Sequence, residues 1–350
     1  MNTIFVIFLG IILIFAAIVI HQKYSIKSFL KKHGFINRMI VEEILYDFSL
    51  PKPKKNGCDM SPTWLLPPQK NPENQKVIVI DAGGTNFRSC LVSFNDEGKV
   101  CVSDFKKTFM PAIEREYSDE EFFEAIADRI DYLKDKAQTI GFCFSYSIDM
   151  TKDGDAVPNA FSKEIKASSV VGFPIGKNLK IELENRGWKK LKKITVINDT
   201  VSALLSGKAF YPDASSYIGF ILGTGMNAAF IDEKGVVDDE KQIIVTESGK
   251  TNTFKLSDFD IDGDKRTALR GQFLLEKCCS GAYLGNTVLS ILHFAAQEKL
   301  FSKESSERFI NLKSLSTIEA DSFLHGISEG KQCKDNPIMT CCAGSYDKKV

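Results

Sequence analysis

The chain has 350 residues, of which 43% are apolar, so it is long enough for two domains with sizeable cores. Lysine plus arginine and aspartate plus glutamate both total 45, and this zero net charge excludes the basic footprint of a nucleic-acid-binding protein. The nine cysteines include no C-x-x-C pair, which argues against a zinc site, and their odd number favours free thiols over a disulfide framework.

The N-terminal segment Thr3–Ile20 contains no charged residue and lies at the lower edge of the length that spans a bilayer. Lysines follow it directly, at positions 23, 27, 31 and 32. By the positive-inside rule, this pattern predicts a single-pass membrane anchor with the rest of the chain in the cytoplasm. A cleaved signal peptide, which would make the protein secreted, and a buried core helix are the alternatives. The missing basic n-region and the lack of a clear A-x-A cleavage site favour the anchor.

Apolar residues at helical spacing predict one or two amphipathic helices over residues 26–50. Pro51-Lys52-Pro53 ends this region, and a polar, proline-rich stretch runs on to Gln75. Residues 26–74 therefore precede the first stretch with a strand pattern.

Residues Val77–Ser89 predict a strand, a glycine turn and a second strand. Val77–Ile80 is an apolar β-branched run, Asp81 ends it, and Gly83-Gly84 supply a tight turn. Successive backbone N–H groups in such a turn can bind an anion, and the carboxylate can hold a divalent metal, directly or through water. The plain alternative is a hairpin with a polar tip. Neither the dinucleotide fingerprint nor the P-loop spacing is present, so no nicotinamide cofactor is expected.

Strands and helices alternate in the next part of the chain. Glu116–Lys136 has the spacing of a surface helix, Thr139–Ser145 that of a buried strand, and Ile194–Asp199 that of a strand followed by a helix. This alternation predicts an α/β fold. Tyr217–Phe230 predicts a second hairpin with a glycine turn. None of the four histidines lies near these motifs, so a general base is expected to be a carboxylate.

These stretches resemble the hexokinase family over residues from about Phe29 to Pro337. Asp81–Arg88 matches the phosphate motif Asp-x-Gly-Gly-Thr-Asn-Phe-Arg, Asn198–Val201 matches Asn-Asp-Thr-Val, and Gly223–Ala228 matches Gly-Thr-Gly-x-Asn-Ala. Looser matches follow. They are Met60–Trp64 with Met-x-Pro-Thr, Phe142–Ser145 with Phe-Ser-Phe-Pro, Phe161–Lys163 with Trp-Thr-Lys, Val245–Gly249 with Asn-Thr-Glu-Trp-Gly, and Gly271–Gly285 with a run ending Ser-Gly-x-Tyr-Leu-Gly.

The resemblance implies a two-lobed actin-like ATPase fold, with a small lobe at residues 75–197, a large lobe at 198–350, and residues 26–74 packing on the large lobe. It implies ATP-dependent phosphorylation of glucose or a related hexose at the 6-hydroxyl, feeding glycolysis, with MgATP as co-substrate. Asp199 is then the base. The other implied sugar ligands are Ser145, Ser162, Lys163, Asn198, Asn227, Glu247 and Glu276.

The resemblance also assigns the two glycine turns to ATP. Asp81 is expected on the magnesium side, through water. The remaining implied nucleotide residues are Gly83, Gly84, Thr85, Asn86, Arg88, Gly223, Thr224 and Gly225. Lys163 and Arg88 would face the negative charge that develops during phosphoryl transfer.

This sequence departs from the family at several positions. The proline of Phe-Ser-Phe-Pro is lost, with Tyr146-Ser147 following Ser145, and Ser248 replaces the tryptophan after Glu247. The Asp-Gly-Ser adenosine motif and the Gly-Ser-Gly-x-Gly-Ala-Ala helix do not occur, so the fold is expected to be C-terminally incomplete. A catalytically impaired, membrane-tethered hexose sensor or a truncated paralogue is therefore an alternative. Repressor-type glucokinases share the fold, but their cysteine-rich zinc motif is absent here.

Overall fold

The computed structural model of the chain describes residues 26–35, 40–49, 57–68, 70–84, 86–161, 165–237, 239–328 and 335–350. The expected membrane anchor at residues 3–20 lies outside these ranges and stays a prediction. Within the described ranges, no helix is long and apolar enough to cross a membrane.

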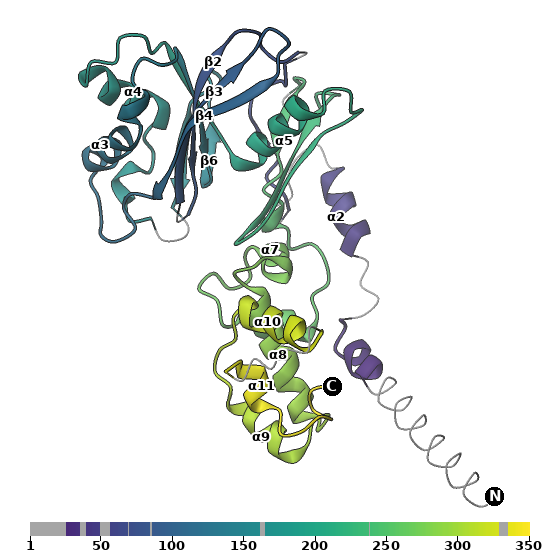
Figure 1. Cartoon of the computed structure of the whole chain (residues 1–350). Helices are drawn as coiled ribbons and strands as arrows, with labels where there is room; N and C mark the ends of the chain where they lie inside the picture. The colour runs from purple at the N-terminus through teal and green to yellow at the C-terminus, as the bar shows by residue number, and fades with distance from the viewer. Residues whose placement is uncertain are drawn as a thin grey trace, which may run out of the picture. The chain divides into compact units, whose positions relative to one another are not determined.

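The chain divides into two compact units, each built from separate stretches of sequence (Figure 1). Unit 1 takes Met1–Cys58, Leu222–Met226 and Ser248–Val350, and unit 2 takes Asp59–Ile221 and Asn227–Glu247. These limits follow the density of contacts, whereas the expected lobes at 75–197 and 198–350 rest on the resemblance. The lobe boundaries therefore stay a prediction.

Unit 2 contains three sheets and the helices that cover them. Its elements in chain order are β1 (Ser61–Pro62), β2 (Lys76–Ala82), β3 (Asn86–Phe94), β4 (Val100–Phe109), α3 (Asp119–Ile130), η1 (Asp131–Leu133), β5 (Thr139–Phe144), β6 (Ser147–Met150), β7 (Ala156–Ala160), η2 (Ser168–Val170), α4 (Ile175–Asn185), β8 (Lys193–Ile197), α5 (Asp199–Phe210), β9 (Ile218–Leu222), β10 (Met226–Asp232) and β11 (Gln242–Val245).

The largest sheet has the strand order β4-β3-β2-β5-β8. Strands β2 and β3 form the predicted hairpin and pair antiparallel, whereas β5 and β8 run parallel to β2. Along β2 the side chains of Ile78, Ile80 and Ala82 are buried, while the residues between them are half-buried. An apolar β-branched run of this kind predicts a buried strand, and its side chains are the more deeply buried on one face because alternate side chains point to opposite faces of a sheet.

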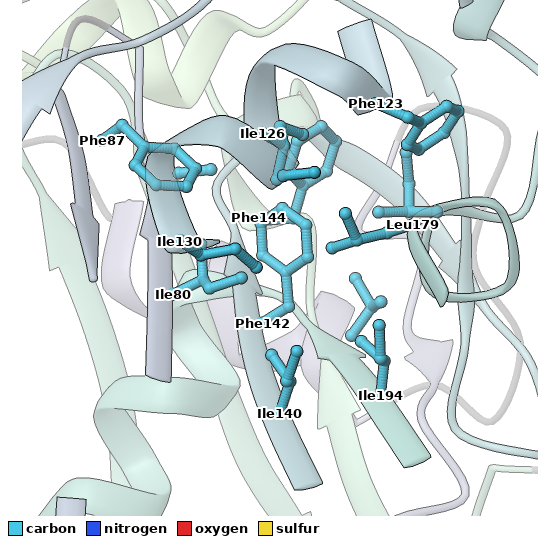
Figure 2. Packing of buried hydrophobic residues seen from close by; sticks show 14 of the residues in the cluster. Ile80, Phe87, Phe123, Ile126, Ile130, Ile140, Phe142, Phe144, Leu179 and Ile194 are labelled. Carbon is cyan, nitrogen blue, oxygen red and sulfur yellow. The ribbon is translucent and has the colours of Figure 1, made fainter. Parts of the chain in front are cut away.

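One face of this sheet packs against α3 and α4, which lie together on one side of it in Figure 1. Phe142 and Phe144 of β5 are fully buried on this face, and Ile126 and Ile130 of α3 pack with them (Figure 2). The alternation of side chains therefore places the intervening residues, including Asp81 and Cys143, on the opposite face.

Helix α3 is shorter than the expected helix over Glu116–Lys136. A capping box fixes its start, because the Ser118 hydroxyl accepts from the Glu121 N–H while the Glu121 carboxylate accepts from the Ser118 N–H. The helix continues as the 3₁₀ turn η1, and Asp135 then takes a left-handed φ of 57°, which cannot continue a right-handed helix.

A second sheet has the strand order β1-β11-β10-β9. It includes the second predicted hairpin, whose strands are β9 and β10. Residues 61 and 62 of β1 pair with residues 245 and 244 of β11, respectively, so the middle of the proline-rich stretch joins this sheet. The third sheet is the antiparallel pair β6 and β7.

Unit 1 is mainly helical. Its described elements are a helix over residues 26–32, α2 (Ile40–Phe48), η3 (Ser248–Lys250), α6 (Asp258–Asp264), α7 (Leu274–Cys279), α8 (Leu284–Gln297), α9 (Lys303–Asn311), α10 (Thr317–Ser328) and α11 (Pro337–Cys341). Its core joins both ends of the sequence, because Phe29 packs in one cluster with Phe259, Leu289 and Phe309.

Candidate functional site

The carboxyl ends of three parallel strands bring the first group of candidate residues together in unit 2. In the register of the sheet, Asp81 of β2 lies beside Cys143 of β5, and Cys143 lies beside Ile197 of β8. Ser145 follows β5, and Asn198-Asp199 follow β8. Ligands of open α/β sheets bind outside the carboxyl ends of the strands, so this edge is the expected position of a site.

The first glycine turn begins at this edge. Arg88 of β3 is the antiparallel partner of Asp81, and its guanidinium donates to the Asp81 carboxylate at 2.5 Å. The Gly83 N–H donates to the Asn86 carbonyl oxygen at 3.0 Å and closes the turn. Both side chains of the ion pair remain more than a third exposed, so they are within reach of a ligand. Thr85, the other expected member of this turn, lies outside the described residues.

Asn198 and Asp199 form the start of helix α5. The Asn198 side chain accepts from the Thr200 N–H at 2.9 Å and from its hydroxyl at 2.6 Å, which is the geometry of a helix N-cap. Asp199 is the first helical residue, where the helix dipole stabilises a negative charge. Asn198 thus has a structural role, and it fixes the backbone from which the Asp199 carboxylate extends.

The negative charges of this edge act on the buried Cys143 thiol. Burial is the main cause that raises the pKa of Cys143 to about 12, and the charges of Asp81 and Asp199 add to it. The thiol sulfur also lies 4.0 Å from the Ser145 hydroxyl. Cys143 therefore stays protonated at neutral pH and separates the two carboxylates with a neutral group.

The third part of the site in unit 2 joins β10 to the end of β11. The Asn227 amide donates to the Glu247 carboxylate at 3.0 Å. Thr246 fixes this contact, because its N–H and hydroxyl both donate to the Ala228 carbonyl oxygen, at 2.8 and 2.9 Å. Glu247 has a left-handed φ of 51°, which is unusual for a side chain of this size and often marks a functional position.

In unit 1, the second glycine turn and Glu276 form one framework. The Glu276 carboxylate accepts from the Met226 N–H at 2.9 Å. A Cβ atom on Gly225 would lie 2.6 Å from the same carboxylate oxygen, so any larger residue there would displace the Glu276 carboxylate. The Gly281 N–H donates to the Gly223 carbonyl oxygen at 2.7 Å and ties the turn to the segment between α7 and α8.

Helix α7, which carries Glu276, is held by a buried ion pair. The Lys277 ammonium, 7% exposed, donates to the Asp264 carboxylate at 2.5 Å, and the same carboxylate accepts from the Gly271 N–H at 2.7 Å. Burial acts to raise the pKa of Asp264, but the hydrogen bonds from Lys277, Gly271 and Thr267 and the charge of Lys277 together outweigh it and hold this pKa below its usual range.

The structure thus assigns the candidate residues to two groups. Unit 2 holds Asp81, Gly83, Gly84, Asn86, Arg88, Ser145, Asn198, Asp199, Asn227 and Glu247. Unit 1 holds Gly223, Thr224, Gly225 and Glu276. Ser162 and Lys163, like Thr85, lie outside the described residues, so their assignment to the site stays a prediction.

Sequence reasoning did not single out Cys143, Tyr146 or Lys277 as parts of the site. Cys143 can be placed only when the register of β2, β5 and β8 is known, and Lys277 only when its partner Asp264 is known. Tyr146 carried a local signal, because it is an aromatic residue directly after Ser145 at a position where the family pattern is lost.

Comparison with known proteins identifies the family. Residues 36–209 match one family model described as hexokinase, and residues 217–338 match a second. Human hexokinase-2 is 28% identical over 286 residues, which are 75% of this chain and 31% of that protein. The hexokinase of Schistosoma mansoni is 29% identical over 283 residues, which are 75% of this chain and 62% of that protein. The chain therefore spans less than two thirds of the length of either relative.

Solved structures agree on the fold. A hexokinase from Schistosoma mansoni complexed with glucose superimposes with a TM-score of 0.73 at 23% identity, over 94% of this chain and 80% of that chain. A second hexokinase structure gives a TM-score of 0.65 at 19% identity, over 87% of this chain and 72% of that one. The expected α/β sugar-kinase fold is confirmed. On the two family-model matches and these relatives, the chain belongs to the hexokinase family.

Proposed function

We propose that the chain catalyses phosphoryl transfer from MgATP to the 6-hydroxyl of a hexose, with glucose as the first candidate substrate. The position of Asp199 carries this proposal. It extends from the N-terminus of α5 at the carboxyl edge of the sheet, where β5 lies between β8 and β2, the strand that carries Asp81 and leads into the glycine turn. Family membership supports the class of reaction, and the relative with glucose bound supports the class of substrate.

In the proposed reaction, Asp199 accepts the proton of the sugar 6-hydroxyl, and the oxygen of that hydroxyl attacks the terminal phosphorus of ATP. The bond from that phosphorus to the oxygen of the leaving ADP breaks, and a hexose 6-phosphate forms, which can enter glycolysis. Catalysis of this kind depends mainly on positioning and on electrostatic stabilisation of the transferred group.

The remaining candidate residues divide between the two substrates. Asp81 faces the magnesium of MgATP through water, and the turns at Gly83–Asn86 and Gly223–Gly225 receive phosphate oxygens. Glu247 and Glu276 accept hydrogen bonds from the sugar hydroxyls, and Lys163 donates to the sugar oxygens. Ser145, Ser162, Asn198 and Asn227 carry groups that can both donate and accept. Carboxylates, amides and hydroxyls are the groups that match the alternating donors and acceptors of a polyol.

The test is a coupled assay of the full chain with MgATP and glucose, run beside calorimetry with glucose alone. Asp199→Asn keeps the shape of the side chain and removes the base, so turnover is expected to fall by about 10²–10⁴-fold while the dissociation constant for glucose changes little. Asp213→Asn is the matched control, because Asp213 is an exposed aspartate of the same unit.

Unchanged turnover in Asp199→Asn would refute the assignment of the base. Glucose binding without turnover in the wild-type chain would refute the proposed activity and indicate a hexose-binding sensor instead.

A further inference from the structure

Tyr146 links two parts of the candidate site in unit 2. It directly follows Ser145 at the end of β5 and is 3% exposed. Its hydroxyl donates to the Gly83 carbonyl oxygen at 2.8 Å, and its ring packs against Phe144 and Phe161, with centroid distances of 4.8 and 5.5 Å. Tyr146 follows the segment Phe142–Ser145 that resembles the family motif, and the resemblance assigns no role to its hydroxyl.

The hydroxyl binds the first backbone carbonyl beyond the pairing of β5 with β2. The Ser145 N–H donates to the Ala82 carbonyl oxygen at 3.1 Å, and the Tyr146 hydroxyl then reaches the next carbonyl along the chain, that of Gly83. Beyond Ala82 the regular strand ends, and the Tyr146 side chain supplies the donor for the first carbonyl after it.

This hydrogen bond sets the direction of a backbone donor in the phosphate turn. Two successive glycines have wide conformational freedom, so the peptide between Gly83 and Gly84 needs an external contact to fix its plane. This peptide is trans, and in a trans peptide the C=O and N–H bonds point in opposite directions. With the Gly83 carbonyl held by Tyr146, the Gly84 N–H is directed to the other side of the turn.

The ring of Tyr146 acts on a second segment. Phe161 packs against it in a T-shaped arrangement at 82° and immediately precedes Ser162 and Lys163 in the sequence. One side chain thus contacts the phosphate turn through its hydroxyl and the start of a sugar-binding segment through its ring.

We infer that Tyr146 is a positioning residue of the proposed reaction, whose hydroxyl holds the Gly83–Gly84 peptide in the orientation that binds phosphate. The inference rests on the proposed function, because the role of the turn in binding ATP belongs to that proposal. It predicts that the hydroxyl affects ATP and leaves the hexose unaffected, whereas the ring supports both.

Tyr146→Phe removes the hydroxyl and keeps the ring. The KM for ATP is expected to rise, and kcat/KM for ATP to fall, by about 3- to 10-fold, as for the loss of one hydrogen bond. The KM for glucose is expected to stay at the wild-type value. A purely structural defect would instead lower kcat through loss of active protein and leave both KM values unchanged.

Tyr132→Phe is the matched control. The Tyr132 hydroxyl also donates to backbone carbonyl groups of unit 2, those of Ser89 at 3.0 Å and Asp104 at 2.9 Å, but it lies away from the glycine turn. This variant is expected to keep both KM values. An equal change of the KM for ATP in the two variants, or no change in Tyr146→Phe, would overturn the inference.

A second measurement separates this inference from the proposed function. Amide hydrogen exchange over residues 77–90, followed by mass spectrometry without ligands, is expected to be faster in Tyr146→Phe than in the wild type and unchanged at the turn in Tyr132→Phe. A wild-type chain without turnover would refute the proposed function alone. Unchanged exchange in Tyr146→Phe would refute the role of Tyr146 whether or not the chain is active.

Discussion

At the scale of single residues, burial and the nearby carboxylates of the candidate site raise the pKa of the Cys143 thiol. It is buried at the end of β5, beside Asp81 in the register and close enough to Asp199 for both charges to disfavour the thiolate. The thiolate is the reactive form of cysteine, so a raised pKa makes the residue inert at neutral pH. Cys143 is therefore expected to resist alkylation although it lies within the candidate site.

Cys143 is predicted to remain unmodified by iodoacetamide in the native protein at about pH 8, because its pKa is raised to about 12. Labelling should increase only as the pH approaches that value or as the protein unfolds. Peptide mass spectrometry after timed labelling measures this. The exposed Cys101 of β4 is the internal control and is expected to react under the same conditions.

Comparable labelling rates at Cys143 and Cys101 in the folded protein would contradict the burial of this thiol. Equal labelling of both in urea is required, since it shows that the protection comes from the fold.

Residues of the site differ in how far the sequence predicts them. The Asn198-Asp199 pair could be placed, because an N-cap residue after an apolar β-branched run marks the change from strand to helix. The left-handed φ of Glu247 could not, because side chains of this kind carry no local signal for it. It depends on Thr246 and Asn227, which belong to two different strand ends.

At the scale of secondary-structure elements, strand β9 lies unusually close to helix α5. A Cβ atom at Gly219 would clash with the backbone oxygen of Thr200, in the first turn of α5. Gly207, later in the same helix, has room for a Cβ atom, since its nearest neighbour there is a Tyr217 ring carbon at 4.0 Å. The same substitution at the two glycines therefore has opposite expected effects.

Gly219→Ala is predicted to lower the free energy of unfolding of unit 2 by about 1–3 kcal/mol, because backbone must move to accept the methyl group. Gly207→Ala is predicted to raise it by about 0.5–1 kcal/mol, since alanine loses less conformational entropy than glycine in a helix. Urea unfolding followed by tryptophan fluorescence measures both, because Trp64 and Trp188 belong to unit 2. Equal stability of the two variants would contradict the close packing of β9 on α5.

Elements with one buried face were predictable from the sequence, and exposed ones were not. The hairpin β2–β3, strand β5 and helix α3 all show apolar residues at the spacing of one face. Strand β4 gave no such signal, because it is the edge of its sheet and nearly every side chain is exposed. Strand β1 is short and is defined only by its pairing with β11, far along the chain.

At the scale of the whole molecule, the two units are assembled from segments that are distant in the sequence. The helix at residues 26–32 belongs with residues 248–350, and the short segment Leu222–Met226 packs there with α7 through Met226 and Leu274. Local periodicity predicts helical structure over residues 26–50, but it does not predict which unit these residues join. That choice depends on complementary surfaces between segments that periodicity does not describe.

His33 is the contact that fixes the N-terminal helix in unit 1. Its imidazole is 8% exposed, lies among Phe29, Phe259 and Phe294, and bonds to two carboxylates. Nδ1 lies 2.8 Å from Asp258, at the start of α6, and Nε2 lies 2.7 Å from Glu298, at the end of α8. A carboxylate at the end of a helix is unfavourable for the helix dipole. The hydrogen bonds that Glu298 accepts from Lys32 and, to a smaller extent, from His33 offset this unfavourable position, and they hold the pKa of Glu298 below its usual range.

His33→Leu keeps apolar bulk among the three phenylalanines and removes both hydrogen bonds to carboxylates. Because Asp258 and Glu298 are partly exposed and can bind water instead, the expected cost is about 2 kcal/mol, near the lower end for bonds to charged groups. Amide exchange at residues 30–35 should accelerate about 30-fold, while exchange in α3 and α4 of unit 2 stays unchanged. His325→Leu is the control, since His325 is exposed on α10 and pairs within its own helix, with Asp321. Unaltered exchange at residues 30–35 would show that apolar packing among the phenylalanines alone holds the N-terminal helix, because this packing is what the leucine preserves.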